Sequence, residues 1–162
     1  PDATLLIVGG ASGTEGETEI AHVHALMQEL KVENQVRFVA PQAHHILSTY
    51  YRAADVVLVP SRSESFGLVA LEAAACGTPV VANAVGGLLT IVEHGRTGFL
   101  VPDRQPEIFA RHIANVLDDP ALSARMSHDA AERAKGYTWS FAAARLRRAY
   151  TDITSRDRVV CK

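Results

Sequence analysis

The sequence predicts an α/β fold in which a Rossmann-like parallel sheet is flanked by helices. Three observations predict it. Short apolar runs without polar alternation, such as residues 56–59, are typical of strands buried on both faces. Longer segments with apolar residues at helical spacing, such as 17–30, separate these runs. The connections are short, so strands and helices alternate along the chain up to about residue 101.

Each element is predicted from its own pattern. Strands are expected where a short apolar run meets a turn signal, at residues 5–8, 36–39, 56–59, 79–82 and 98–101. Helices are expected at 17–30, 44–54, 66–76, 89–93, 106–118, 121–135 and 138–153. Gly77 closes the helix at 66–76, and Pro120 and Gly136 separate the last three helices. Trp139 and Phe141 are expected to pack the last helix onto the domain.

Composition excludes several classes of protein. The 162 residues are 48% hydrophobic and 21% charged, which is typical of a globular domain and too apolar for a disordered chain. A formal net charge of −2 gives no general attraction to nucleic acid, so no nucleic-acid partner is expected. No apolar stretch is long enough for a transmembrane helix, so membrane association is not indicated. Cys76 and Cys161 lie far apart, outside any metal-ligand spacing, which favours a cytoplasmic protein without a metal site.

The loop at residues 60–67 is the most informative segment. Parallel sheets bind ligands beyond the carboxyl ends of their strands, and this loop leads from such an end into a helix. Backbone N–H groups around Gly67 to Val69 are expected to be free and to form an anion site with the helix dipole. Gly67 would also let a ligand approach the backbone closely.

Two acidic residues accompany this helix start. Because helical side chains lean toward the N-terminus, the carboxylate of Glu72 is expected to reach back beside a bound ligand. A phosphate on the helix end and sugar hydroxyls on Glu72 would suit a nucleotide. The residues alone leave open that Glu64 is only an acid favoured by the helix dipole and that Glu72 is a solvated helix residue.

Glu64 and Glu72 are separated by seven residues, which include Ser-Phe-Gly-Leu. This spacing resembles the acidic EX7E motif of retaining GT-B glycosyltransferases, in particular family 4. Other segments agree with that family in order and spacing, so that the resemblance covers nearly the whole chain: residues 6–10, 36–39, 51–55, 59–61, 72–82, 85–87 and 95–101. In that family this region is most of the C-terminal Rossmann-like domain, which holds the nucleotide-sugar donor.

The resemblance implies a role for each matching residue. Glu64 is expected to be the catalytic acid that contacts the donor sugar, and Glu72 to bind the ribose hydroxyls. The backbone amides of Phe66 and Gly67 would lie near the sugar, and those of Leu68 and Val69 would hold the diphosphate. The remaining expected nucleotide-sugar-binding residues come from the first glycine turn, the loop that reads the base and the loop at 60–67: Gly9, Gly10, Gln42 and Ser65.

The implied reaction moves a hexosyl group, with retention, from a UDP-sugar to a small hydroxyl acceptor. UDP-N-acetylglucosamine is one candidate donor, and inositol phosphate is one candidate acceptor. Amides and basic groups would stabilise the leaving nucleoside diphosphate, so neither a metal nor a tightly bound cofactor is expected. One departure concerns the upstream Arg and Lys with which the family neutralises the diphosphate, because Lys31 is the single basic residue in 1–36. This chain is therefore expected to be truncated at its N-terminal side, to lack the domain that holds the acceptor, and to be inactive alone.

Several alternatives remain within and beyond the family. Four segments are most similar in sequence to the inositol-phosphate N-acetylglucosaminyltransferases of mycothiol synthesis: residues 8–13, 51–55, 63–73 and 85–88. Sucrose-phosphate synthase-like enzymes share much of this sequence. A nucleotide-binding module without transfer chemistry is another hypothesis, as is a glycoside-cleaving enzyme with Glu64 and Glu72 as paired carboxylates. The expected organisation is a nucleotide-sugar-binding domain at residues 1–137, followed by a C-terminal helix and tail at 138–162.

Overall fold

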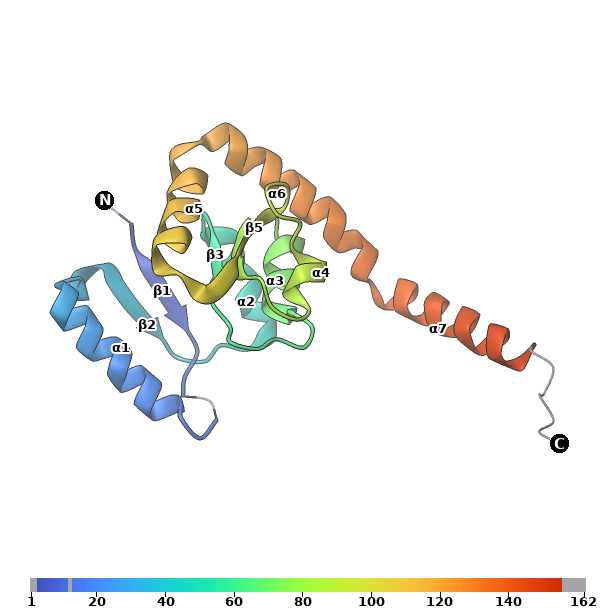
Figure 1. Ribbon diagram of the computed structural model, residues 1–162, viewed down its shortest axis with the longest axis horizontal. Helices are drawn as coiled ribbons and strands as arrows, with labels where there is room; N and C mark the ends of the chain where they lie inside the picture. Colours follow the sequence, from blue (N-terminus) through green and yellow to red (C-terminus); the bar gives the residue numbers. More distant parts are fainter. Residues whose placement is uncertain (1–2, 12, 156–162) are drawn as a thin grey trace. The chain divides into compact units, whose positions relative to one another are not determined.

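The computed structural model describes residues 3–11 and 13–155, which form two compact units (Figure 1). The first unit comprises residues 1–47 and the second residues 48–162. Each unit contains a parallel sheet with helices packed against it, so the predicted α/β class is confirmed. Among the described residues, no helix is both long and apolar enough to cross a bilayer.

The first unit is a single βαβ crossover. Strand β1 (Leu5–Val8) pairs in parallel with β2 (Val36–Val39), and α1 (Gly16–Leu30) connects them. The rings of His24 on α1 and Phe38 on β2 stack 4.5 Å apart, which places the helix on the sheet. A short 3-10 turn, η1 (Glu33–Gln35), leads into β2.

Strand β1 is less buried than its apolar sequence predicts. Leu5 and Leu6 retain 42% and 45% of their exposure, so the expectation of a strand buried on both faces is wrong here. Consecutive side chains of a strand point to opposite faces of the sheet, so both faces are partly open at the start of β1.

The second unit contains a three-stranded parallel sheet in the order β3-β4-β5. Its strands are β3 (Val57–Val59), β4 (Val80–Asn83) and β5 (Gly98–Val101). Helix α2 (His44–Ala53) precedes the sheet, α3 (Leu68–Ala75) connects β3 to β4, and α4 (Leu88–Ile91) connects β4 to β5. The predicted alternation of strand and helix is therefore confirmed.

The core lies on both faces of β4, and every residue of that strand is buried. Val80 and Ala82 face one cluster, with Ala70, Ala73, Leu88 and Ile91 from α3 and α4. Val81 faces the other cluster, with Phe99, Val101, Phe109, Val116 and Met126. Because side chains alternate across a strand, one apolar run supplies both cores, as the unbroken hydrophobic sequence predicts.

Three longer helices follow β5 and a 3-10 turn, η2 (Pro102–Arg104). They are α5 (Pro106–Asp118), α6 (Pro120–Ala134) and α7 (Trp139–Thr154), with η3 (Lys135–Tyr137) before the last. Figure 1 shows α7 continuing beyond the end of α6, away from the sheet of this unit. Trp139 is 91% exposed and Phe141 57%, so the expectation that they pack the last helix onto the domain is wrong. The C-terminal helix and tail are expected at 138–162. Residues 156–162 of this segment lie outside the described residues.

His112 of α5 is a titratable group that the fold places against an aromatic ring. Its imidazole stacks on Phe99 at a centroid distance of 4.2 Å, and its buried Nδ1 has no hydrogen-bond partner within the described part of the chain. Burial, followed by the neighbouring His94 and Arg111, lowers the pKa of His112 below its usual 6.5.

We expect this lowered pKa to make the protein less stable in mild acid. Below pH 6.5 His112 binds a proton in the unfolded chain but stays neutral in the folded protein. The free energy of unfolding therefore falls as the pH drops toward the folded-state pKa of His112. Urea unfolding between pH 7.5 and pH 5 measures this slope. The slope should be shallower in His112→Gln, and equal slopes in the two proteins would contradict the assignment.

Candidate functional site

The candidate site is centred on the loop that joins β3 to α3. Sequence spacing predicts a helix from Phe66, but α3 begins two residues later, at Leu68. Gly67 has a left-handed backbone (φ 96°, ψ 45°), which a right-handed helix cannot include. A Cβ at Gly67 would lie 3.1 Å from Leu88 Cδ2, so packing against α4 also favours glycine.

Glu64 folds its side chain back onto this loop. Its Oε1 accepts hydrogen bonds from the backbone N–H of Gly67 at 3.0 Å and of Phe66 at 3.3 Å. The expectation that the Gly67 N–H is free is therefore wrong, because the nearest carboxylate already occupies it. A carboxylate is a favourable partner for the positive end of a helix. Glu64 and the two amides expected beside the sugar thus form one hydrogen-bonded group.

The next two positions, Leu68 and Val69, begin α3 itself. The first helical hydrogen bond runs from Leu71 N to Gly67 O at 3.0 Å, so the amides of Leu68 and Val69 precede the helical ladder and point out of the helix end. Their side chains are 61% and 44% exposed, and Phe66 is 45% exposed. Phe66, Leu68 and Val69 therefore lie on the surface, where a ligand can reach them, whereas Gly67 is buried.

The turn after β4 holds the loop in place through backbone contacts. Gly87 N donates to Glu64 O at 3.0 Å. A Cβ at Gly86 would overlap the carbonyl oxygen of Glu64, and one at Gly87 would overlap the carbonyl of Phe66. Neither glycine is among the residues that the sequence assigns to the site, although the resemblance includes Val-Gly-Gly at 85–87.

Asn83 anchors the beginning of the same loop. It is the last residue of β4, it is 1% exposed, and its Nδ2 donates to Ser61 O at 2.9 Å. Its Oδ1 is also buried, and no described residue donates to it. A single asparagine inside an apolar strand gives no spacing signal, so the sequence did not mark it as part of the site.

Glu72 lies on the second turn of α3 and is half-buried. Its Oε2 accepts a hydrogen bond from the Tyr51 hydroxyl of α2 at 2.8 Å. Burial, then the hydrogen bond and charge of Glu72, raise the pKa of Tyr51 far above its usual value, so that the phenol stays protonated and acts as the donor. Tyr51 is not among the site residues that the sequence predicts, although it lies in the Tyr-Arg-Ala-Ala-Asp segment of the resemblance.

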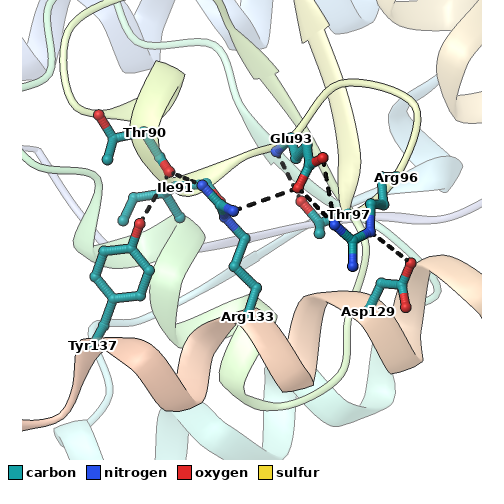
Figure 2. Close-up of polar contacts among 8 residues, drawn as sticks. All are labelled: Thr90, Ile91, Glu93, Arg96, Thr97, Asp129, Arg133 and Tyr137. Carbon is teal, nitrogen blue, oxygen red and sulfur yellow. Dashed lines mark hydrogen bonds and ion pairs between the residues drawn. The ribbon is translucent and has the colours of Figure 1, made fainter.

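Arg133 of α6 supports α4, which carries the Gly86–Gly87 turn at its start (Figure 2). Its guanidinium donates to the carbonyl of Thr90 at 2.6 Å and of Ile91 at 2.9 Å, and it pairs with Glu93 at 3.4 Å. These carbonyls are at the C-terminal end of α4, where a helix has no further N–H partners of its own. Tyr137 adds a hydrogen bond to Thr90 O at 3.0 Å.

A second ion pair extends the same network (Figure 2). Arg96 donates to Asp129 of α6 at 3.1 Å and approaches Glu93 at 3.3 Å, and Glu93 N donates to Thr97 Oγ1 at 2.8 Å. The segment between α4 and β5 is therefore fastened to α6 at both of its ends.

Three of the expected binding residues belong to the first unit. Gly9 has a positive φ of 148°, and its N–H donates to Val39 O at 3.0 Å, so the glycine turn after β1 meets the end of β2. A Cβ at Gly10 would lie 3.4 Å from Pro41 Cγ. Gln42 donates to Ala40 O at 2.8 Å. The first unit thus brings its own predicted residues together, and the second unit does the same for Glu64 to Val69 and Glu72.

No cluster of three or more His, Cys, Asp or Glu side chains that could hold a metal ion occurs within residues 3–11 and 13–155. The metal independence implied by the resemblance remains a prediction.

The candidate site thus has one acidic residue before the first turn of α3 and a second acid one turn into that helix. The family model described as "Glycosyl transferases group 1" matches residues 1–133, so the chain belongs to that family. The solved structures that it resembles are GT-B glycosyltransferases, which confirms the predicted fold class.

Two curated relatives are similar to this chain over most of its length. The chain is 48% identical, over 94% of its length, to D-inositol 3-phosphate glycosyltransferase 2 of Catenulispora acidiphila. It is 44% identical, over 98% of its length, to the D-inositol 3-phosphate glycosyltransferase of Corynebacterium glutamicum. The chain spans 35% and 38% of the lengths of these two relatives.

Two solved structures are similar in fold and sequence. Sucrose-phosphate synthase from Thermosynechococcus elongatus has a TM-score of 0.83 at 39% identity, with 94% of this chain and 39% of that one covered. Anabaena HepE in complex with UDP has a TM-score of 0.83 at 30% identity, with 95% and 42% covered.

We expect Gly87→Ala to destabilise the protein because the new Cβ has no space beside the carbonyl of Phe66. Overpacking of this kind costs about 1–3 kcal/mol. Urea unfolding measures it, with Gly136→Ala as the matched control, since a Cβ at Gly136 meets nothing within 4 Å. Equal stability of the two variants would show that the turn is not in close contact with the loop.

Arg133→Ala should loosen α4. Loss of a charged donor to two carbonyls is expected to cost about 1.5–3 kcal/mol, and the amides of Ile91 and Val92 should exchange faster with solvent. Residue-resolved hydrogen exchange measures this effect. Lys135→Ala is the control, because its pair with Glu132 is exposed on both sides. Unchanged protection of Ile91 and Val92 would exclude the proposed support.

Proposed function

We propose that this chain is the donor-binding part of a retaining glycosyltransferase that transfers a hexosyl group from a UDP-sugar to a small hydroxyl acceptor. One observation carries the proposal. Glu64 precedes the first turn of α3 and Glu72 lies on its second turn, in a chain that belongs to a glycosyl transferase family.

The UDP donor is supported by a structural neighbour. Anabaena HepE was solved with UDP and, at 29% identity and a TM-score of 0.81, with UDP-glucose. The transferred sugar of this chain is a separate question, for which UDP-N-acetylglucosamine stays one candidate.

The second unit would hold the ribose, diphosphate and sugar. We assign the ribose hydroxyls to the Glu72 carboxylate and the diphosphate to the amides of Leu68 and Val69, where the helix dipole favours negative charge. Glu64 would contact the sugar, supported by its own hydrogen bonds to Phe66 and Gly67. Ser65 lies between these groups in the chain and is exposed.

Gly9, Gly10 and Gln42 stay proposed contacts of the nucleotide. This assignment rests on the resemblance, in which the glycine turn and the loop at 40–42 belong to the donor side of the domain. Figure 1 shows both segments at the ends of β1 and β2.

In the proposed reaction the bond between the anomeric carbon and the diphosphate oxygen breaks, and its electron pair leaves with UDP. The acceptor oxygen bonds to the same face of the anomeric carbon, and its proton passes to the departing UDP. Amides that are already oriented at the start of α3 would stabilise the charge that develops on the diphosphate. No metal has a role in this proposal.

The names of the relatives support two candidate acceptors. The 48% and 44% identities to D-inositol 3-phosphate glycosyltransferases favour an inositol phosphate. A sucrose-phosphate synthase-like acceptor is the second candidate, supported by the solved structure at 39% identity.

A separate acceptor-binding domain, a cytoplasmic location and the boundary at 137/138 remain predictions, as does inactivity of this chain alone.

The proposal is tested by calorimetric titration of the chain with UDP, ADP and GDP. UDP is expected to bind in preference to the other two, and Glu72→Gln should weaken it about tenfold, or 1.4 kcal/mol. Glu107→Gln, an exposed acid at the start of α5, is the matched control and should bind as the unmodified chain does. Absence of binding, or binding that Glu72→Gln leaves unchanged, would contradict a donor site at α3.

A further inference from the structure

Tyr51 is a half-buried tyrosine whose backbone, ring and hydroxyl each contact another segment of the chain. It lies near the end of α2 and packs against the core cluster formed by β3, β4, α3 and α4. Its carbonyl oxygen accepts a hydrogen bond from the Thr78 hydroxyl at 2.6 Å, and Thr78 is 3% exposed. The backbone of Tyr51 is therefore held by α2 and by the segment that leads into β4, and its ring packs against the apolar core.

The fixed ring presents one polar atom, and that atom meets Glu72. The Tyr51 hydroxyl donates to Oε2 at 2.8 Å, which is a hydrogen bond to a charged acceptor and therefore a strong one. The pKa of Tyr51 is raised mainly by burial and next by Glu72, so the phenol donates over the whole physiological pH range. A phenol that always donates can hold a carboxylate in one orientation.

Glu72 needs such a restraint if it is to bind a ribose. A glutamate side chain has three rotatable bonds, and fixing it on binding costs conformational entropy. A carboxylate that is already oriented avoids that cost when the ligand arrives. The vicinal hydroxyls of a ribose are donors, so they match a carboxylate whose orientation is set in advance.

We propose that Tyr51 is a positioning residue that orients the Glu72 carboxylate to accept hydrogen bonds from the ribose hydroxyls of the bound nucleotide. This inference rests on the proposed function. The competing interpretation is that the hydrogen bond only ties α2 to α3. The two interpretations differ in one respect: a structural tie affects every ligand of the site equally, whereas a positioning role affects only ligands with ribose hydroxyls.

The experiment compares two ligands, UDP and 2′,3′-dideoxy-UDP, by calorimetric titration of the whole chain. Tyr51→Phe keeps the ring and removes only the hydroxyl. We expect this variant to bind UDP about fivefold more weakly and to bind dideoxy-UDP as the unmodified chain does. Tyr150→Phe, which alters an exposed tyrosine of α7, is the matched control and should change neither affinity.

A double variant tests whether the effect passes through Glu72. In a Glu72→Gln background, Tyr51→Phe should cause little further loss of UDP affinity, because the carboxylate that it orients is gone. Additive losses would overturn the inference, as would an equal loss for both ligands. Retained dideoxy-UDP binding also shows that the variant is folded.

The outcomes separate this inference from the proposed function. If Glu72→Gln weakens UDP binding but Tyr51→Phe does not, the inference fails and the donor site stands. If the unmodified chain binds no nucleotide, or if Glu72→Gln leaves UDP binding unchanged, the proposed function fails and the inference fails with it.

Discussion

The backbone hydrogen bond from Gly87 to Glu64 is the contact on which the candidate site depends. The loop from residue 60 to 67 has no regular structure of its own, so its shape is set by what touches it. Gly87 holds its middle and Asn83 holds its beginning, and both come from β4 or the turn after it. The conformation of the acidic loop is therefore determined by the neighbouring strand as much as by its own sequence. Only glycine permits this contact, because any side chain at position 87 would occupy the space of the Phe66 carbonyl.

The two acids of the site are restrained in different ways. Glu64 is held by backbone amides two and three residues further along the chain, so its orientation is a local property of the loop. Glu72 is held by a side chain from another helix, so its orientation depends on how α2 packs against α3. A change in the loop would thus alter the first acid and leave the second in place. This arrangement separates the part of the site assigned to the sugar from the part assigned to the ribose.

Much of this structure could be predicted from the sequence. The strands at 36–39 and 98–101 and the helix at 106–118 were predicted with the bounds observed, since apolar runs and helical spacing flanked by Gly or Pro are strong local signals. Glu64 and Glu72 were identified from their spacing and from the family resemblance. The start of α3 was wrong because Gly67 adopts a left-handed conformation that composition does not reveal. Trp139 was expected to be buried because it is large and apolar, but it lies at the start of a helix that leads away from the sheet, and it is exposed.

Contacts between distant segments were the part that sequence reasoning missed. Tyr51 and Glu72 are 21 residues apart, and Gly87 is 23 positions after Glu64, so no spacing rule along a single helix or loop connects them. The free amide expected at Gly67 was wrong for a different reason. The N–H donors of a helix end can bind a ligand, but here a carboxylate already in the loop accepts from the Gly67 N–H at lower entropic cost.

Helix α3 also bears on how such a domain could diversify. Its inward positions are filled by Ala70 and Ala73, each 0% exposed, and Gly67 is closed in by Leu88, so these positions admit no larger residue. The neighbouring side chains of Phe66, Leu68 and Val69 point to the surface. Substitution at those three positions leaves the core untouched while it changes the surface next to the helix end. Residues that can vary at the surface and residues that must stay small for folding therefore alternate along α3 and the two positions before it.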